Sequence, residues 1–383
     1  MKLFDVYPLY DVEPVKAFDA TVIDKDGVEY LDLYGGHAVI SIGHSHPHYV
    51  NRLKKQIDAI GFYSNAVHNS LQSQLASKLG ELSGYNDYQL FLCNSGAEAN
   101  ENALKLASFI TGKSRVIAFE NGFHGRTSAA VAVTDNEKIN APINKQQHVT
   151  FLPLNQLTLV ETELEKGDVC CVIVEPIQGV GGLDEGTTAF FKGIEKLCKE
   201  NNVILILDEV QSGFGRSGKF FAHQHHDITP DIISIAKGMG NGFPVGGVMI
   251  APNIKPEYGM LGTTFGGNHL ACAASLAVLE VIETEDLIDN ARLTGEYFKS
   301  CVANLPGVQN VKGRGLMLGL EFDFEVGALR KKLIYNEHIF TGGAKNKKLL
   351  RILPPLTVGK NEIDQFIDAL KKVLEEEKEV HEI

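Results

Sequence analysis

Short runs of hydrophobic residues recur along the middle of this 383-residue chain, and few polar residues interrupt them. Many of these residues are β-branched, and they do not alternate with polar ones. Such runs are typical of strands that are buried on both faces of a parallel sheet. We expect strands over Gln89–Leu92, Arg115–Phe119, Val149–Leu152, Cys171–Val174, Val203–Leu207, Ile232–Ile235 and Gly247–Ile250.

Stretches with helical periodicity alternate with these runs, for example Ala97–Ile110 and Thr188–Glu200. In the first stretch, Ala103, Leu104 and Ala107 recur at the spacing of one helix face. Strands that alternate with helices predict βαβ units. The predicted fold class is therefore α/β, with a doubly wound and mainly parallel sheet.

The two ends of the chain differ from its middle. Residues 1–50 contain short strand-like pieces such as Ala20–Asp24. A long helix over His269–Thr284 should lead into a C-terminal α+β part, and the charged residues 371–383 should form a last helix. The length of the chain suits one large domain plus a smaller one.

Composition narrows the class of protein. The chain is 44% hydrophobic and 22% charged, which is ordinary for a soluble globular enzyme. Its net charge of -12 argues against a nucleic-acid partner, because phosphate backbones bind lysine and arginine. No apolar run is long enough to span a bilayer, and the first residues do not resemble a signal peptide. We therefore expect neither a nucleic-acid nor a membrane partner.

The cysteines bear on the cellular compartment. They lie mostly within apolar or helical patterns and lack the spacing of metal fingers. We interpret them as reduced thiols of a cytoplasmic protein. The six residues are Cys93, Cys170, Cys171, Cys198, Cys272 and Cys301.

Two groups of closely spaced histidines suggest a metal site. Pro47 prevents regular helical geometry in the first group, and no cysteine or carboxylate completes a ligand set in either. We therefore expect no metal site. The groups are His44, His46 and His48, and His223, His225 and His226.

Two expected strands end on residues with useful chemistry. Lys237 follows Ile232–Ile235, and Asp208 follows Val203–Leu207. Ligands of parallel sheets bind at the carboxyl ends of strands. A lysine amine forms a Schiff base with an aldehyde, and a buried carboxylate keeps a pyridinium nitrogen protonated. Pyridoxal phosphate (PLP) requires such a pair, although a lysine after a strand is more commonly a solvated loop residue.

Two further loops carry candidate binding residues. Ser95, Gly96 and Ala97 follow a strand and open a helix, whose free N–H groups suit a phosphate; the alternative is a simple helix cap. After another strand, Phe123 offers a ring for stacking and Arg126 a fork for a carboxylate. The alternative is a core phenylalanine and a surface arginine.

Six segments together resemble the class III (ω-amino) aminotransferases. The resemblance runs in family order from Gly36 to Pro355. Within the class, the chain is most similar to acetylornithine and succinylornithine aminotransferases of arginine metabolism, as Leu350–Leu356 and the compact length indicate. The segments are Asn94–Glu101, Phe123–Thr127, Glu175–Gly179, Asp208–Gly213, Ala236–Gly238 and Gly262–Asn268.

The resemblance implies a fold, a reaction and an assembly. The fold is PLP fold-type I, with residues 51–268 as the large PLP-binding domain and residues 1–50 and 269–383 as the small domain. The reaction transfers the ω-amine of N2-acetyl-L-ornithine to 2-oxoglutarate and gives N-acetylglutamate 5-semialdehyde and glutamate. The active unit is a homodimer with shared active sites.

The resemblance also implies roles for the residues that surround the cofactor ring. Lys237 carries PLP as a Schiff base and moves protons, and Asp208 pairs with the pyridine nitrogen. Gln211 bonds the ring hydroxyl. Val210 packs on one face of the ring, and Phe123 packs on the other.

Further roles concern the phosphate and the substrates. Ser95, Gly96 and Ala97 hold the phosphate, and Thr264 reaches it from the partner subunit. The substrate residues are Thr263, Arg126 and Arg351: Arg126 binds the carboxylate distant from the reacting amine, and Arg351 binds the α-carboxylate of glutamate or 2-oxoglutarate.

The chain departs from the family pattern at Val180, where relatives have Glu. In those relatives the carboxylate pairs with the arginine that is Arg351 here while an ω-amine substrate is bound. Val180 cannot neutralise this arginine. Either Arg351 stays open and hydrated, or Asp184 or Glu185 reaches it, and we expect the open arginine.

Other functions stay open at the level of sequence. The acyl group is not fixed, and 4-aminobutyrate, ornithine, lysine or diamine aminotransferases and aminomutases share the fold. A PLP-less binding subunit is a further alternative, against which Lys237, Asp208 and Phe123 argue.

Overall fold

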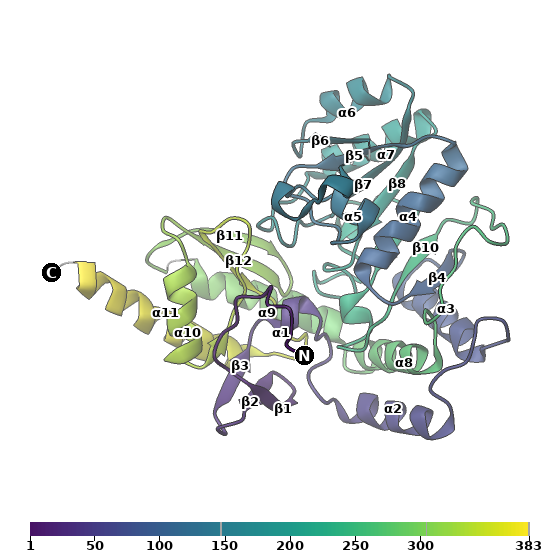
Figure 1. Ribbon diagram of the computed structural model, residues 1–383. Coiled ribbons are helices and arrows are strands. Elements are labelled where there is room, and N and C mark those ends of the chain that lie inside the picture. Colours follow the sequence, from purple (N-terminus) through teal and green to yellow (C-terminus); the bar gives the residue numbers. More distant parts are fainter. Residues whose placement is uncertain (146–147, 304, 382–383) are drawn as a thin grey trace.

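A computed structural model describes residues 1–145, 148–303 and 305–381 of the chain (Figure 1). Its centre is a seven-stranded sheet in which β5 to β9 are parallel and β10 is antiparallel to both of its neighbours. The predicted doubly wound, mainly parallel sheet is confirmed. In spatial order the strands are β4 (Gln89–Cys93), β10 (Gly246–Ile250), β9 (Ile232–Ile235), β8 (Ile204–Asp208), β7 (Val169–Val174), β5 (Arg115–Phe119) and β6 (Val149–Leu152).

Burial explains why the central strands do not alternate in polarity. Every residue of β7, β8 and β9 is buried, because helices cover both faces of the sheet. One face packs on α4 (Gly96–Thr111), and part of the other face packs on α6 (Leu157–Leu164) and α7 (Thr188–Glu200). At the carboxyl ends of β8 and β9, Asp208 and Ala236 line a cavity.

Two smaller sheets accompany the central one. In a four-stranded sheet, β13 pairs with β3 and so joins a late segment to the N-terminal strands. The other sheet has three antiparallel strands from the C-terminal part. The strands are β1 (Pro14–Phe18), β2 (Thr21–Asp24), β3 (Glu29–Asp32) and β13 (Ile339–Phe340) in the first, and β11 (Val308–Arg314), β12 (Met317–Phe322) and β14 (Leu349–Ile352) in the second.

The remaining elements are helices. The predicted helix over His269–Thr284 is α8, with the same bounds. The last helix, α11 (Lys360–His381), includes most of the expected helix over 371–383, whose residues 382–383 lie outside the described part. The others are α1 (Gly35–Ala38), α2 (Pro47–Ala59), α3 (Ser70–Ser83), α5 (Ser128–Ala132), α9 (Leu287–Val302), α10 (Gly327–Tyr335), and the 3-10 turns η1 (Glu137–Ile139), η2 (Pro142–Asn144), η3 (Ala222–His225) and η4 (Lys237–Met239).

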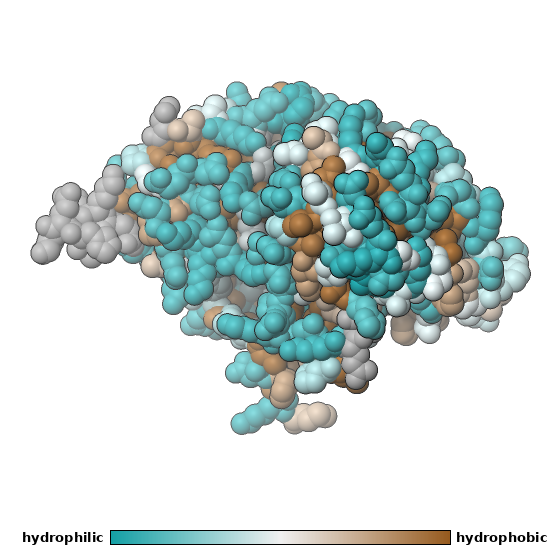
Figure 2. All heavy atoms as spheres, turned by 90° about the horizontal axis from the view of Figure 1, so that it is seen from above, coloured by the Kyte–Doolittle hydropathy of each residue, from teal (hydrophilic) through white to brown (hydrophobic). Residues whose placement is uncertain are grey.

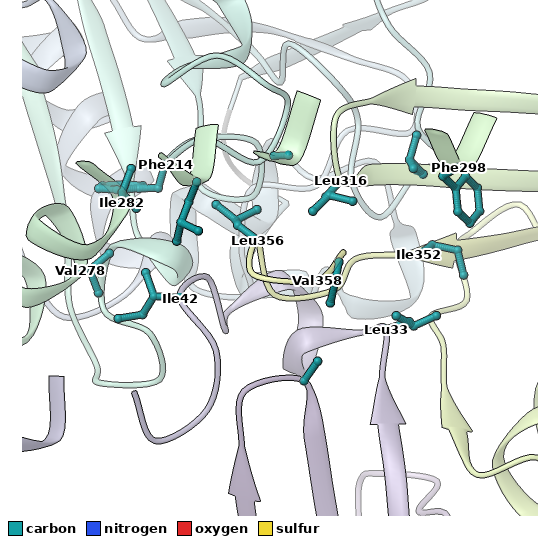
Figure 3. Close-up of a cluster of buried hydrophobic side chains, with 14 of the residues drawn as sticks. Leu33, Ile42, Phe214, Val278, Ile282, Phe298, Leu316, Ile352, Leu356 and Val358 are labelled. Carbon is teal, nitrogen blue, oxygen red and sulfur yellow. The ribbon is translucent and has the colours of Figure 1, made fainter. Parts of the chain in front are cut away.

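One hydrophobic core joins both ends of the chain. Figure 3 shows Leu33 after β3, Val278 of α8, Phe298 of α9, Ile352 of β14 and Leu356 gathered in this core. All five side chains are buried. Segments far apart in sequence are thus held together beside the central sheet. The three-part division of the chain into domains stays a prediction.

The surface and the helices bear on whether a segment of the chain could span a membrane. On the face shown in Figure 2, hydrophobic residues form separate patches among hydrophilic ones. No helix of the described residues is long and apolar enough to cross a bilayer. The six cysteines are all free thiols, and five of them are buried.

Candidate functional site

A cavity of about 410 Å³ lies at the carboxyl ends of β8 and β9. Most of the predicted cofactor residues line it, although they come from four separate segments of the chain. Arg126, one of the three predicted substrate residues, lines it as well. The predicted residues around the cavity are Ser95, Gly96, Ala97, Phe123, Arg126, Asp208, Val210, Gln211 and Lys237.

Asp208 is buried at the end of β8, and three donors fix its carboxylate. Its Oδ2 atom accepts hydrogen bonds from Nδ2 of Asn100 at 2.8 Å and from Nδ1 of His124 at 2.7 Å. Its Oδ1 atom accepts from the backbone N–H of Val210 at 3.0 Å. These bonds hold the carboxylate in one orientation at the base of the cavity.

His124 and Glu175 lie next to Asp208 and share its electrostatic environment. Burial lowers the pKa of His124, but the hydrogen bond and the charge of Asp208, together with the charge of Glu175, outweigh it and raise the pKa. Burial raises the pKa of Glu175 to about 7; the charge of His124 opposes this shift and that of Asp208 adds to it. His124, Glu175 and Asp208 thus form one buried cluster of interacting charges behind the cavity.

Glu175 also ties two loops of the site together. One carboxyl oxygen accepts from the backbone N–H of Phe123 at 2.9 Å, and the other accepts from that of Gly179 at 2.8 Å. No role was predicted from the sequence for Asn100, His124 or Glu175. Each of the three is a polar residue within one of the segments that carry the family resemblance, next to an otherwise apolar helix or strand. That position was the only signal in the sequence that could have identified them.

Lys237 directly follows β9 and Ala236, and its side chain is half-buried. Its backbone lies in the left-handed region with φ 47°, which costs a residue with a side chain about 1–2 kcal/mol. Burial lowers the pKa of its amine to about 8; the charge of Asp208 opposes this shift and that of Arg351 adds to it. More of this amine is therefore uncharged at neutral pH than of an ordinary lysine, as a nucleophile requires.

The N-terminus of α4 forms another wall of the cavity. Oγ of Ser95 accepts from the N–H of Glu98 at 3.2 Å, and the Glu98 carboxylate accepts from the N–H of Asn94 at 3.0 Å, which is a capping arrangement. The N–H groups of Gly96 and Ala97 have no partner among the described residues. A Cβ atom at Gly96 would lie 2.6 Å from Val210, so only glycine leaves this corner open.

Arg351 lines a second cavity, also of about 410 Å³, that shares Phe123 and Val180 with the first. Its Nη1 atom donates to the Gly179 carbonyl at 2.9 Å and more weakly to Gln211 at 3.4 Å. The structure thus places the two predicted carboxylate-binding residues, Arg126 and Arg351, on different cavities with Val180 between them.

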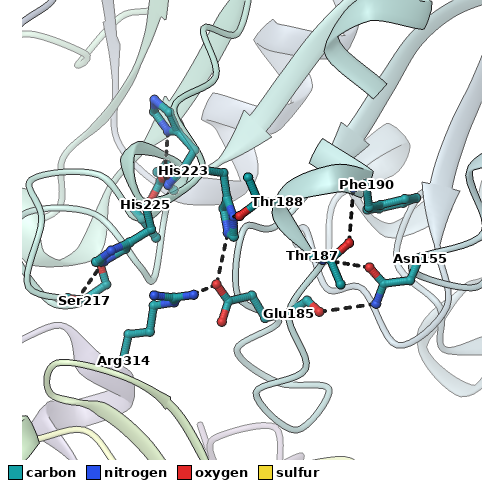
Figure 4. A network of polar contacts seen from close by, with 12 residues as sticks. Asn155, Glu185, Thr187, Thr188, Phe190, Ser217, His223, His225 and Arg314 are labelled. Atoms are coloured by element: carbon teal, nitrogen blue, oxygen red, sulfur yellow. Dashed lines mark hydrogen bonds and ion pairs between the residues drawn. The ribbon is translucent and has the colours of Figure 1, made fainter. Parts of the chain in front are cut away.

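Arg351 forms no ion pair with a carboxylate in the described part of the chain. Asp184 pairs instead with Lys312 at 2.9 Å. Glu185 pairs with Arg314 at 2.7 Å, as Figure 4 shows, and with His226 at 3.0 Å. As expected, neither Asp184 nor Glu185 reaches Arg351. Arg351 is not hydrated, however, because it is buried and donates to the backbone carbonyls of Gly343 and Gly179.

Thr263 and Thr264 are not brought to the cavity within one chain. Thr264 is exposed, and Thr263 uses its hydroxyl to accept from the N–H of Gly266 at 3.0 Å. Neither residue lines the cavity that holds the other cofactor residues.

The histidines of both groups make individual contacts. His44 bonds to Asp32 at 2.8 Å, and His223 bonds to the fully buried Glu209 at 2.7 Å. Over the described ranges, no three His, Cys, Asp or Glu residues are grouped so as to hold a metal ion. The partners of the others are Glu285 for His46, Glu280 for His48, the Ser217 carbonyl for His225, and Glu185 for His226.

Known proteins resemble this chain over nearly its whole length. The family model for class-III aminotransferases matches residues 7–374. The acetylornithine aminotransferase of Bacillus subtilis is 40% identical over 97% of this chain and 97% of its own. That of Archaeoglobus fulgidus is 39% identical over 91% and 92%.

Solved structures agree with this relationship. An ornithine aminotransferase from Toxoplasma gondii, crystallised with PLP at partial occupancy in its active site, superposes with a TM-score of 0.88. It is 29% identical and covers 97% of this chain and 92% of its own. A second structure of the enzyme from T. gondii ME49 gives a TM-score of 0.90 at 28% identity, with the same coverage.

Proposed function

Because this chain belongs to the class-III aminotransferase family, we propose that it transfers the ω-amine of N2-acetyl-L-ornithine to 2-oxoglutarate with PLP as its cofactor. The products are N-acetylglutamate 5-semialdehyde and glutamate, in a step of arginine biosynthesis. The observation that carries the choice of substrate is the 40% identity to an acetylornithine aminotransferase over 97% of both chains.

The cavity has the groups that PLP needs. When bound, PLP supplies an aldehyde that reacts with amines and a ring that accepts electrons from the substrate. Lys237 would attach the cofactor through its amine, whose lowered pKa favours the uncharged form. The buried carboxylate of Asp208 would keep the ring nitrogen protonated, with Asn100 and His124 holding that carboxylate in place.

The other walls of the cavity suit the rest of the cofactor. The free N–H groups of Gly96 and Ala97 and the capping residue Ser95 would bind the phosphate at the positive end of α4. Phe123 and Val210 would cover the two faces of the ring.

Gln211 would donate to or accept from the ring hydroxyl. A Cβ atom at Gly179 would lie 2.1 Å from Oε1 of Gln211, so the glycine leaves this amide the space it occupies.

Two separate arginines suit the two carboxylates of 2-oxoglutarate. Arg126 would bind the carboxylate far from the reacting carbon, and Arg351 would bind the α-carboxylate. N-acetylornithine carries one carboxylate, which Arg126 would bind. Lys237 would then carry protons between the substrate carbon and the cofactor.

We also propose that the active unit is a homodimer with shared sites. The rings of Phe62 and Phe265 lie against each other in a tilted arrangement with their centres 5.5 Å apart, and both are exposed in the single chain. Tyr63 is exposed beside them, so a partner subunit would cover apolar rings here. The adjacent Thr264 would then reach the partner's phosphate, with Thr263 near its substrate.

Two further proposals concern domains and location. The large domain would comprise residues 51–268, and the small domain residues 1–50 and 269–383. The free thiols of all six cysteines support a cytoplasmic location.

The proposed substrate is tested by mixing the purified PLP-loaded protein with single amine donors. At equal donor concentrations, the absorbance of the bound cofactor should change fastest with N-acetylornithine and more slowly with ornithine and 4-aminobutyrate. A preference for ornithine or 4-aminobutyrate would overturn the substrate and leave the reaction class intact.

A further inference from the structure

The second cavity has an unusual balance of charge. Its polar lining includes Arg330, Lys345, Arg351, His37 and Tyr34, and its carboxylate is that of Asp135. The cavity borders the cofactor cavity at Phe123 and Val180, so a small molecule inside it would lie next to the reacting atoms.

One of its cations is already neutralised. Nζ of Lys345 lies 2.9 Å from the Asp135 carboxylate, and it also donates to the Asp135 backbone carbonyl at 3.0 Å. Neither Arg330 nor Arg351 forms an ion pair with any carboxylate of the described ranges. Two guanidinium groups therefore face one cavity without an ion-pair partner among the described residues.

Arg351 is buried, with 4% of its surface exposed. Burial lowers its pKa, Tyr34 opposes this shift, and the positive charge of Arg330 adds to it. Its protein partners are neutral: the carbonyls of Gly343 and Gly179 and the amide of Gln211. A buried cation without a counter-ion is costly, and an anionic ligand would remove that cost.

Arg330 comes from α10 and reaches the same loop as Arg351. Its Nη2 atom donates to the Thr341 carbonyl at 3.0 Å, and its guanidinium lies 5.9 Å from the centre of the Tyr10 ring. Its Nε atom is buried and has no partner among the described residues. A Cβ atom at Gly343 would lie 2.6 Å from Nη1 of Arg330, so this glycine makes room for the arginine.

A strained turn completes the cavity. Gly35 to Ala38, the residues of α1, all have positive φ, with 69° at His37 and 62° at Ala38. Left-handed backbone is costly for residues with side chains and is often kept at functional sites. The turn places the His37 ring against the Tyr34 hydroxyl at the wall of the cavity.

We propose that Arg330 is a further substrate-binding residue of this cavity, where it contacts a carboxylate of the dicarboxylate substrate beside Arg351. The inference rests on the proposed function, because it takes 2-oxoglutarate and glutamate as the ligands. Arg330 serves only the half-reaction that uses them. N-acetylornithine has a single carboxylate, which Arg126 binds in the other cavity.

The first test measures binding without reaction. Glutarate has the two carboxylates of 2-oxoglutarate but neither an oxo nor an amino group. Calorimetric titration of the PLP-loaded protein should give roughly tenfold weaker binding for Arg330→Gln than for the unchanged protein. Arg292→Gln is the control, because Arg292 is partly exposed and pairs with Asp289 on α9, and it should not change the affinity.

The second test separates a binding role from a structural one. Single-turnover absorbance should show that Arg330→Gln needs about tenfold more glutamate for half-saturation, with N-acetylornithine unaffected. Arg330→Lys keeps the charge but loses the two-pronged guanidinium. Its glutamate concentration for half-saturation should lie between those of Arg330→Gln and the unchanged protein. Unchanged glutarate affinity would overturn the proposal, as would equal impairment of both half-reactions. If glutarate binding depends on Arg330 but N-acetylornithine does not react, the substrate proposal fails and this site stands.

Discussion

Nδ1 of His124 lies 2.7 Å from Oδ2 of Asp208, and both side chains are buried beneath the cofactor cavity. Glu175 belongs to the same cluster, because the charges of both residues act on its carboxyl group. The protonation of His124 and Glu175 therefore sets the charge beside Asp208, the proposed partner of the ring nitrogen.

The first prediction concerns the pH dependence of stability. Burial raises the pKa of Glu175 from 4.5 to about 7. The folded protein therefore binds more protons than the unfolded chain between these pH values, and this contribution to stability is lost as the pH rises through the range. Glu175→Gln removes this ionisable group. Between pH 4.5 and 7, the free energy of unfolding of the variant should therefore fall less steeply than that of the unchanged protein, and the two slopes should differ by at most about 1.4 kcal/mol per pH unit.

Urea unfolding of the cofactor-free protein at several pH values would measure this difference. Glu165→Gln is a suitable control, because Glu165 is exposed after α6. Parallel stability profiles of the Glu175→Gln variant and the unchanged protein would show that Glu175 does not titrate in this range.

The second prediction concerns attachment of the cofactor. Lys237→Ala should abolish covalent attachment and reduce turnover by several orders of magnitude, because the nucleophilic amine is gone. Borohydride reduction followed by peptide mapping identifies the modified lysine. The assignment fails if a different lysine of the unchanged protein carries the label.

The sequence predicts a structural element well when the residues that determine the element lie within one segment of the chain. The bounds of β9, α7 and α8 agree with the prediction, because buried runs and helical periodicity are read within a single segment. The strand β7 begins at Val169, two residues before the expected start, because Val169 and Cys170 are also buried. The pairing of β13 with β3 lacks such a signal, because it joins segments about 300 residues apart in sequence.

The same distinction holds for the site. The loops that follow β8 and β9 were predictable because parallel strands end at one edge of a sheet. The left-handed turn at His37 was not, since a residue with a side chain disfavours that backbone. The second cavity was not predicted either, because Tyr34, Arg330 and Arg351 meet only in the folded chain.

The third prediction concerns assembly. If Thr264 bonds the phosphate in the partner's site, Thr264→Ala should weaken PLP binding by roughly 1.5–3 kcal/mol, the contribution of a hydrogen bond to a charged group. Equilibrium dialysis of PLP would measure the loss. Light scattering at the assay concentration should show a dimer, and a fully active monomer would contradict the shared site.

The fourth prediction concerns the substrate carboxylate common to both half-reactions. Arg126→Lys keeps the charge but loses the two-pronged contact, so both N-acetylornithine and glutamate should react less efficiently, each by about tenfold. Single-turnover absorbance with each donor would measure this. Impairment with only one donor would mean that the two substrates use different anchors.

The last prediction concerns Val180. Arg351 has neutral protein partners, and Asp184 and Glu185 are paired with other cations. Glutamate therefore meets an arginine that has no salt bridge to break. In Val180→Glu the new carboxylate would lie where the two cavities meet, because Val180 lines both of them. Arg351 lines the second of these cavities.

An ion pair between this introduced carboxylate and Arg351 would have to open before glutamate or 2-oxoglutarate binds. The glutamate concentration for half-saturation should then rise by roughly tenfold, while the N-acetylornithine half-reaction is spared, because that substrate does not use Arg351. Val180→Gln is the matched control, since it adds similar volume without charge and should leave the glutamate response closer to that of the unchanged protein. Stopped-flow absorbance with each donor decides between the outcomes. If Val180→Glu handles glutamate as the unchanged protein does, Val180 contributes packing alone and Arg351 is not limited by a competing carboxylate.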